Sequence, residues 1–344
     1  MKIMQSIQTM RNKFSLGILV LAVVVLVGGC AAKDKETVGS KPVEEVRVAS
    51  WSQPITEQIN LLVDDEKDFY KENGTKVTFI PGAGGGDAIK NILTGQADIA
   101  FTDPASLYFA LDKGEELKVI YNIYPQNVFN VVSLTDKKIT KPEDLKGKTI
   151  GVYSLSSGTR HNLLLLLHQA GLSESDVTIV ETGLLNFAPL MQGQVDATAA
   201  TDTGLAIGKQ KGLGEVNVIE VKDYLNVPSD VYVVTEKTYQ EKREVLTSFL
   251  EGYQQSSQWM IDSPQEAASL AVQLAIDGKD EASNLEIVNL RNLSSLSSDP
   301  QDKTLGTLDL DLLQKGADIY QSVGLIENNI DMSQVVVDDF TSKK

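Results

Sequence analysis

A motif that occurs twice constrains this chain more than any other feature. The first copy reads Gly-Gln-Ala-Asp-Ile-Ala-Phe-Thr-Asp from Gly95 to Asp103, and the second reads Gly-Gln-Val-Asp-Ala-Thr-Ala-Ala-Thr-Asp from Gly193 to Asp202. Each copy follows a short helical pattern, and its glycine can adopt the left-handed conformation that ends a helix. The small apolar residues that follow are typical of a strand buried on both faces. The repeat predicts two equivalent helix–strand units of an α/β fold; the alternative is chance similarity between ordinary units.

Both copies end in Thr-Asp, which makes these residues candidates for ligand binding. In an open α/β sheet the carboxyl ends of the strands face the ligand crevice. We therefore expect Asp103, Thr201 and Asp202 to contribute to one shared site. The second copy has one extra residue before its Thr-Asp pair.

The N-terminal segment has the features of an export signal. Lys2, Arg11 and Lys13 precede an acid-free apolar run, residues 16–27, which is too short for a comfortable membrane span. The run leads into Gly-Gly-Cys, which resembles the lipobox of bacterial lipoproteins, and Cys30 is the only cysteine of the chain. The resemblance implies that Cys30 receives the lipid and becomes the new N-terminus, which leaves no cysteine for a disulfide within the chain.

The segment after this signal differs in composition from the rest of the chain. We predict that residues 1–29 are a lipoprotein signal peptide and that residues 30–45, polar and charged, are a lipid-anchored flexible tether. The protein would then lie on the outer face of the cell membrane, attached through the lipid on Cys30. The remaining chain is long enough for two domains. The whole chain has a formal net charge of −16, which repels nucleic acid and anionic headgroups, so nucleic acid is not expected as a partner.

A glycine loop follows the second predicted strand. Trp51 ends the first strand, and the second, residues 76–80, runs into a loop that contains Gly84 and Gly85 before a helix. Free backbone N–H groups at a helix start suit an anion or polar group, so these residues are candidate ligand contacts. The glycine spacing also permits a dinucleotide-binding interpretation, with Asp103 about 20 residues further on. The loop lacks the Lys-Ser/Thr pair of a P-loop and its helix is short, so no cofactor is expected.

A second polar loop opens the helix that runs to Gln169. It contains the consecutive residues Ser156, Ser157, Gly158, Thr159 and Arg160. Hydroxyls, free N–H groups and one arginine favour a polar or anionic group on a small ligand, and the alternative is a well-capped helix with a solvated arginine. Tyr124 and Asn186, in loops that follow other predicted strands, are further candidates.

Two strongly β-forming runs, residues 128–134 and 230–235, divide the chain into two lobes. We expect the chain to cross between lobes at the first run and to return at the second. Lobe 1 then comprises residues 46–135 and 230–344, and lobe 2 comprises residues 136–229. The predicted fold class is α/β, with a ligand held between the lobes of a monomer.

These motifs resemble those of the SsuA/THI5-like (NMT1) family of bacterial solute-binding lipoproteins. The resemblance rests on four segments, which are residues 95–98, 141–152, 157–159 and 263–268. It implies a type II periplasmic-binding-protein-like fold with two crossing segments, and binding of a solute without chemistry. It also implies partners, namely the permease and ATPase subunits of an ABC importer for taurine, sulfonates, nitrate or pyrimidine precursors of thiamine.

The residues leave two solute classes open. Trp51 resembles a tryptophan of the pyrimidine-precursor binders, where an aromatic face stacks a heterocycle, although the acid- and histidine-rich motifs of those proteins are missing around it. The Ser-Ser-Gly-Thr-Arg loop instead resembles the loop that holds oxyanions in sulfonate and taurine binders. Asp103 and Asp202 would repel an anion unless one of them faces a ligand amine. We therefore expect a thiamine-precursor pyrimidine or a sulfonate- or taurine-like compound.

Little in the chain supports the rival class, an enzyme. There is no Gly-x-Ser-x-Gly motif, and the two histidines, His161 and His168, are seven residues apart, without the spacing of a metal site. We expect neither catalysis nor a bound metal. A hydrolytic enzyme that uses Asp103 and Asp202 as a pair is one alternative, and an orphan ligand-binding receptor or sensor lipoprotein is another.

Overall fold

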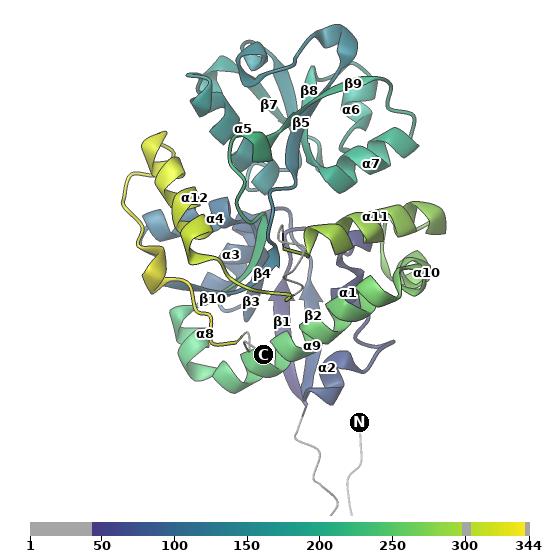
Figure 1. The fold of residues 1–344 in the computed structure, drawn as a ribbon, viewed down its shortest axis with the longest axis vertical. Helices are drawn as coiled ribbons and strands as arrows, with labels where there is room; N and C mark the ends of the chain where they lie inside the picture. The colour runs from purple at the N-terminus through teal and green to yellow at the C-terminus, as the bar shows by residue number, and fades with distance from the viewer. Residues whose placement is uncertain (1–42, 298–303, 341–344) are drawn as a thin grey trace, which may run out of the picture. The chain divides into compact units, whose positions relative to one another are not determined.

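The computed structural model describes residues 43–297 and 304–340, which form two five-stranded sheets (Figure 1). In spatial order the first sheet consists of β2 (Thr75–Ile80), β1 (Glu44–Ala49), β3 (Ile99–Thr102), β10 (Asp230–Thr235) and β4 (Leu117–Tyr124). The second consists of β7 (Thr178–Glu181), β6 (Thr149–Val152), β8 (Ala197–Thr201), β5 (Phe129–Leu134) and β9 (Val216–Glu220). In each sheet the first three strands are parallel, and the fourth is antiparallel to both of its neighbours. The α/β prediction is confirmed, and the two sheets share one plan.

The chain passes twice between the part built on the first sheet, lobe 1, and the part built on the second, lobe 2. It leaves lobe 1 at residues 125–128, between β4 and β5, and returns at residues 221–229, between β9 and β10. The structure corrects one predicted boundary, because β5 pairs with β8 and β9 inside lobe 2. Lobe 1 therefore does not extend to residue 135. A β-forming run indicates a buried strand, but its composition does not say which sheet it joins.

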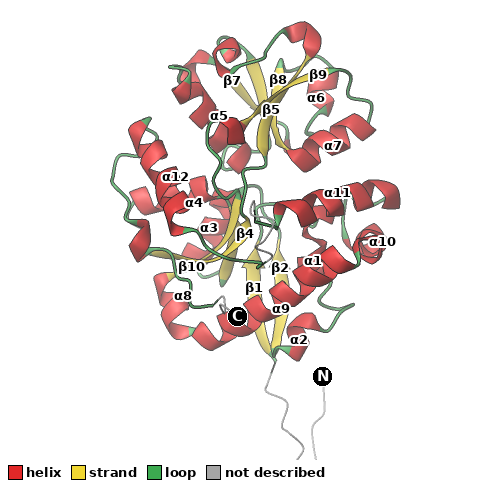
Figure 2. Ribbon diagram, in the orientation of Figure 1, coloured by secondary structure: helices red, strands yellow, loops and turns green. Residues whose placement is uncertain are grey.

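Helices lie on both faces of each sheet (Figure 2). The helices of lobe 1 that precede the first crossing are α1 (Ile59–Leu62), α2 (Phe69–Glu72), α3 (Gly85–Leu93) and α4 (Pro104–Asp112). Directly after the second crossing, lobe 1 continues with β10 and with the helices α8 (Glu236–Glu241) and α9 (Arg243–Asp262). Those of lobe 2 are α5 (Gly158–Gln169), α6 (Ala188–Met191) and α7 (Asp202–Gln210). The C-terminal helices are α10 (Pro264–Leu274), α11 (Glu281–Ser294) and α12 (Leu310–Ser322). Helix α10 packs on α11, and α12 packs on α4.

Strand β10 shows how the first sheet is buried on both faces. Val231 and Val233 belong to the apolar cluster formed with α3, α4 and α12, whereas Tyr232 and Val234 belong to the cluster formed with α2 and α9. Alternate side chains of a strand point to opposite faces of the sheet. The continuous apolar composition of this run is therefore explained by its central position beneath two helical layers.

The two copies of the repeat form equivalent units, each a helix followed by the third strand of a sheet. Asp98 precedes β3, and its carboxylate accepts a hydrogen bond from the backbone N–H of Arg47 in β1 at 2.9 Å. Asp196 precedes β8, and its carboxylate accepts one from the backbone N–H of Thr149 in β6 at 3.0 Å. Each aspartate ties its strand to the neighbouring parallel strand, so the two copies have the same structural role.

The described residues bear only partly on the predicted N-terminal segments. Within these residues no helix is long and apolar enough to cross a membrane. The predicted signal peptide, residues 1–29, and the predicted lipidation site, Cys30, lie outside the described part of the chain. Of the predicted tether, residues 43–45 are described, and β1 already begins at Glu44.

Candidate functional site

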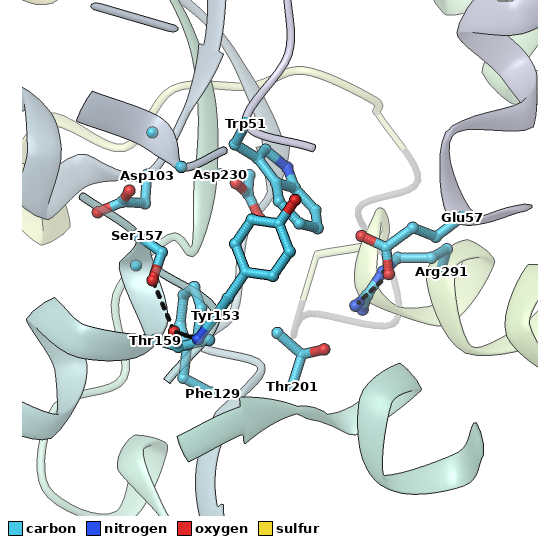
Figure 3. A pocket seen from close by; sticks show the side chains of 13 residues that line it. Trp51, Glu57, Asp103, Phe129, Tyr153, Ser157, Thr159, Thr201, Asp230 and Arg291 are labelled. Carbon is cyan, nitrogen blue, oxygen red and sulfur yellow. Dashed lines mark hydrogen bonds and ion pairs between the residues drawn. The ribbon is translucent and has the colours of Figure 1, made fainter. Parts of the chain in front are cut away.

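A cavity lies between the two lobes, at the carboxyl ends of the parallel strands (Figure 3). We call it the central cavity, and it contains about 380 Å³ of space not filled by protein atoms. Lobe 1 lines it with Trp51, Glu57, Gly84, Gly85, Asp103, Asp230 and Arg291, and lobe 2 with Phe129, Tyr153, Ser157, Gly158, Thr159 and Thr201. This is the position expected for a ligand site in open α/β sheets.

Many of the residues predicted to bind a ligand line this cavity. They are Trp51, Gly84, Gly85, Asp103, Ser157, Gly158, Thr159 and Thr201. Each of these residues ends a strand or follows one. The carboxyl ends of parallel strands meet at one edge of a sheet, which is why segments far apart in the sequence converge here.

Arg160 and Ser156 do not line the central cavity. The Arg160 guanidinium donates hydrogen bonds to the Glu174 carboxylate from Nε at 3.1 Å and from Nη2 at 2.8 Å. Ser156 Oγ donates to the carbonyl oxygen of Ala83 in the opposite lobe at 3.2 Å. Arg160 therefore directs its charge to Glu174 and not into the central cavity. Ser156 and Arg160 line a separate hollow that also contains Lys90 and Lys113.

The hydroxyl groups of this loop that do reach the cavity are held in place by one another. Ser157 Oγ and Thr159 Oγ1 are 2.7 Å apart, and Thr159 Oγ1 accepts a hydrogen bond from the Tyr153 backbone N–H at 3.0 Å (Figure 3). The loop after β6 thus ties the start of α5 to the backbone of Tyr153. Ser157 Oγ also donates to the Ser154 carbonyl oxygen at 2.7 Å and accepts from the Ser154 backbone N–H at 3.2 Å, so of the two hydroxyls Thr159 Oγ1 is the one that keeps a lone pair for a ligand.

Glycines at two helix starts allow the lobes to approach closely. A Cβ atom on Gly84, whose φ is +137°, would lie 2.5 Å from the carbonyl oxygen of Ser156. A Cβ atom on Gly158 would lie 3.1 Å from the carboxyl carbon of Asp103 in the opposite lobe and 2.6 Å from the Phe129 ring of its own lobe. The backbone N–H of Gly86 donates to the Ser156 carbonyl oxygen at 2.9 Å. The glycine loop therefore uses this N–H group for contact between the lobes.

Asp103 connects the central cavity to His161 of α5. Its carboxylate accepts hydrogen bonds from the Ser106 backbone N–H at 2.9 Å and from Ser106 Oγ at 2.7 Å, and Oδ1 lies 3.3 Å from His161 Nδ1. Burial by itself raises the pKa of Asp103, but the hydrogen bonds and charge of His161 together with Ser106 outweigh burial and lower the pKa. Asp103 is therefore a buried carboxylate at neutral pH.

Asp230, at the start of β10, is a second buried carboxyl in the cavity. It is 5% exposed. Burial, Asp103 and Glu57 raise the pKa of Asp230 well above its ordinary value, and Arg291 only partly offsets them. Among the described residues, none donates a hydrogen bond to this carboxyl group. A ligand amine or N–H group would satisfy it.

Arg291 of α11 is fully buried and joins the two lobes. Its Nη2 donates to Glu57 Oε2 at 3.0 Å, and its Nη1 donates to Asp202 Oδ1 at 2.7 Å. Its guanidinium lies 5.0 Å from the centre of the Tyr124 ring. The predicted residues Asp202 and Tyr124 therefore contact Arg291 and do not line the central cavity. Two carboxylates neutralise this cation, which is the only one among the described lining residues.

Several lining residues are not predicted from the sequence. They are Glu57, Phe129, Tyr153, Asp230 and Arg291. Tyr153 follows β6 as Trp51 follows β1, so the strand-end argument applies equally to it. No local signal marks Glu57 and Arg291, because these residues are 234 positions apart and become neighbours only in the folded chain.

The predicted residue Asn186 lies beside the central cavity, in a larger groove that we call the outer groove. This groove contains about 1520 Å³ of space not filled by protein atoms. The backbone of Asn186 has a φ of +46°, and a Cβ atom on Gly204 would lie 2.5 Å from its Nδ2.

Within residues 43–297 and 304–340, no group of three or more His, Cys, Asp or Glu side chains is placed to hold a metal ion.

Comparison with known proteins places this geometry in a family. A family model described as NMT1/THI5 like matches residues 55–267. The chain belongs to the NMT1/THI5-like family. The matched segment contains both crossings and most of the strands of both lobes, so the resemblance seen in the sequence motifs is confirmed.

Relatives and solved structures extend this family assignment. The riboflavin-binding protein RibY of Chloroflexus aurantiacus is 23% identical over 350 residues, which cover 95% of this chain and 96% of the relative. The formylaminopyrimidine-binding protein of Halalkalibacterium halodurans is 23% identical over 241 residues, which cover 69% and 71%. The solved structure of the alkanesulfonate-binding protein SsuA from Xanthomonas axonopodis pv. citri matches with a TM-score of 0.69 and 17% identity over 87% of this chain and 99% of that chain. This likeness confirms the two-lobe periplasmic-binding-protein-like fold.

Proposed function

We propose that this protein is an extracytoplasmic solute-binding lipoprotein that captures a small amine-bearing heterocycle between its lobes and delivers it to an ABC-type permease. The family and the two-lobe fold support the class. The names of two relatives specify nitrogen heterocycles, riboflavin and a formylaminopyrimidine.

The observation that carries the proposal is the combination of acids and aromatic rings in the central cavity. The acids are Glu57, Asp103 and Asp230, and the rings are those of Trp51, Phe129 and Tyr153. The positive charge of Arg291 is already matched by two carboxylates. A planar base stacks on aromatic faces, and its N–H or amine groups donate to carboxyl oxygens.

A sulfonate or taurine-like solute, the second class expected from the sequence, has less support. Arg160 is paired with Glu174, outside the cavity. An anionic group in the central cavity would approach the Asp103 carboxylate without an unmatched cation among the described lining residues, which is unfavourable in a buried site.

The test is a thermal-shift series on the full-length chain purified in detergent. The compounds are 4-amino-5-hydroxymethyl-2-methylpyrimidine, thiamine, riboflavin, taurine, alkanesulfonates and nitrate. A bound heterocycle is expected to stabilise the protein by roughly 2.7 kcal/mol at a hundredfold excess over its Kd. Stabilisation by sulfonates alone, or turnover of any of these compounds, would overturn the proposal.

The Asp230→Asn variant tests the amine contact. We expect it to weaken heterocycle binding about tenfold, since a charge-assisted hydrogen bond is lost. It should also stabilise the unliganded protein by about 1 kcal/mol at pH 7, because the wild-type carboxyl is buried without a donor. A raised folded-state pKa means that this difference disappears below about pH 4, where the unfolded chain is protonated as well. Calorimetric titration and urea denaturation measure the two effects.

The control for Asp230→Asn is Asp65→Asn, since the Asp65 side chain is 84% exposed. It should change neither quantity. Unchanged binding by Asp230→Asn would remove this residue from the site.

Membrane anchoring through Cys30 is part of the same proposal. The motif that ends at Cys30 supports it. A Cys30→Ser chain should lose incorporation of labelled fatty acid and leave the membrane fraction. A variant that keeps the label would contradict lipidation at this residue.

A further inference from the structure

The outer groove adjoins the central cavity. Both are lined by Trp51, Glu57, Tyr153, Thr159 and Thr201, which form the junction between the two spaces. The rings of Trp51 and Tyr153 stand at 87° to each other, with centres 6.1 Å apart. A ligand in the central cavity therefore lies directly beside the groove, with these two rings at the boundary.

The outer groove is apolar where the central cavity is acidic. Leu184, Leu185 and Met191 line it from lobe 2, and Ile55 and Ile276 line it from lobe 1. Leu185 is 68% exposed, Ile276 is 50% exposed and Leu184 is 49% exposed. Single exposed apolar side chains need no explanation, but a group of them around one hollow marks a binding surface.

Two buried polar atoms at the junction have no partner among the described residues. They are Trp51 Nε1, a donor, and Glu57 Oε1, an acceptor. Leaving such an atom unpaired is unfavourable, so native proteins normally pair it with protein, water or ligand. Since both residues line both spaces, a solute that passes through the junction is placed to pair with either atom.

We propose that the solute has two parts: an amine-bearing heterocycle in the central cavity and a second, largely apolar ring or chain in the outer groove. This inference rests on the proposed function, because it takes the central cavity as the place of the heterocycle. The junction residues Trp51 and Glu57 contact the solute where the two parts meet. Leu185 and Ile276 cover the second part from opposite lobes.

The sizes of the two spaces support this occupant. The space not filled by protein atoms, which includes space open to solvent, is about 380 Å³ at the central cavity and about 1520 Å³ at the outer groove. A solute of one ring would occupy the smaller space and leave the apolar wall of the larger one in water. A second apolar part removes that wall from water, and burial of apolar surface is favourable in proportion to its area.

The test compares solutes of one and of several rings on full-length protein in detergent, by calorimetric titration. The probes are 4-amino-5-hydroxymethyl-2-methylpyrimidine, thiamine, which adds a positively charged thiazolium ring to the same pyrimidine, and riboflavin, whose three fused rings carry an imide N–H and an apolar dimethylbenzene edge. Each is measured with the wild type, with Leu185→Ser, with Ile276→Ser on the opposite wall, and with Leu293→Ser. The last variant is the matched control, because Leu293 is 66% exposed but does not line either space.

We expect thiamine or riboflavin to bind at least about tenfold more tightly than the single-ring pyrimidine. Leu185→Ser and Ile276→Ser should each weaken that ligand about fivefold to tenfold, leave the single-ring pyrimidine unchanged, and differ from Leu293→Ser, which should have no effect. If the single-ring pyrimidine binds as tightly as the larger compounds and the groove variants do not matter, the inference is wrong while the proposed function stands. If no heterocycle binds, the proposed solute class is wrong and the inference falls with it.

Discussion

The two copies of the repeat hold their strands alike but end in different contacts. Asp98 and Asp196 accept the same backbone hydrogen bond from the neighbouring parallel strand. At the other end of the strand, Asp103 contacts a histidine of lobe 2, whereas Asp202 contacts an arginine of lobe 1. The start of the unit thus has the same structural role in both copies, whereas its end makes a different contact between the lobes in each copy.

One extra residue in the second copy explains the different ends. Asp103 is the N-cap of α4 and accepts a hydrogen bond from the Ser106 backbone N–H. In the second copy Thr201 takes the capping position of α7 and accepts from the Gly204 backbone N–H. Threonine and aspartate both cap helices, because each offers a short side chain with an acceptor oxygen. Asp202 is therefore released from capping and pairs with a cation across the lobe interface.

The largest effect is expected from removing the partner of the second copy. In Arg291→Met, the buried carboxylate of Glu57 loses its counter-charge, and so does Asp202. Breaking a buried ion pair by removing one partner costs about 3–5 kcal/mol. We expect the free energy of unfolding, measured by urea denaturation at pH 7, to fall by about that amount.

Arg160→Met is the matched control for Arg291→Met. Its partner, Glu174, is 47% exposed, so its pair is worth at most about 1 kcal/mol. Equal losses in the two variants would show that the lobe contact at Arg291 contributes no more than a surface pair.

A smaller effect is expected at the start of the first copy, in Asp98→Asn. Burial by itself raises the pKa of Asp98, but Arg47 and Lys242 outweigh burial and lower the pKa to about 2. Compared with an unfolded value of about 3.9, this shift corresponds to about 2 kcal/mol of stability at neutral pH. A lowered folded-state pKa stabilises the protein above the unfolded pKa, and the contribution is lost as the pH falls toward 2.

Urea denaturation of wild type and Asp98→Asn between pH 7 and pH 3 measures this contribution. The stability difference should be constant near neutrality and shrink below about pH 4. A difference that does not change with pH would mean that the carboxylate charge is not its source.

Local spacing predicts much of the fold and part of the site. The Thr-Asp ends of the repeat, the glycine loop and Trp51 lie at or just after the ends of strands. Position along a strand determines which edge of the sheet a residue reaches. Composition does not locate the first crossing between the lobes, because the run at residues 128–134 has the composition of any strand buried on both faces. Only pairing with β8 and β9 assigns it to lobe 2.

Side-chain direction and long-range pairing limit the prediction of the site. Gly158 and Thr159 line the central cavity, but the next residue, Arg160, points to Glu174, because successive residues of a helix face different directions. Arg291 has no motif around it. Its role depends on two carboxylates that the folded chain brings together, and neither is near it in the sequence.

The smallest effect is expected in the second copy, in Asp196→Asn. The backbone N–H of Thr149 and the charge of Lys137 lower the pKa of Asp196, as in the first copy, but its side chain is 30% exposed whereas that of Asp98 is 6% exposed. Solvent screens the ion pair with Lys137, so we expect a loss of less than about 1 kcal/mol by urea denaturation at pH 7. Asp65→Asn is again the exposed control. If Asp196→Asn costs as much as Asp98→Asn, the backbone hydrogen bond that the copies share sets their stability; a smaller cost assigns the difference to burial and to the two cations around Asp98.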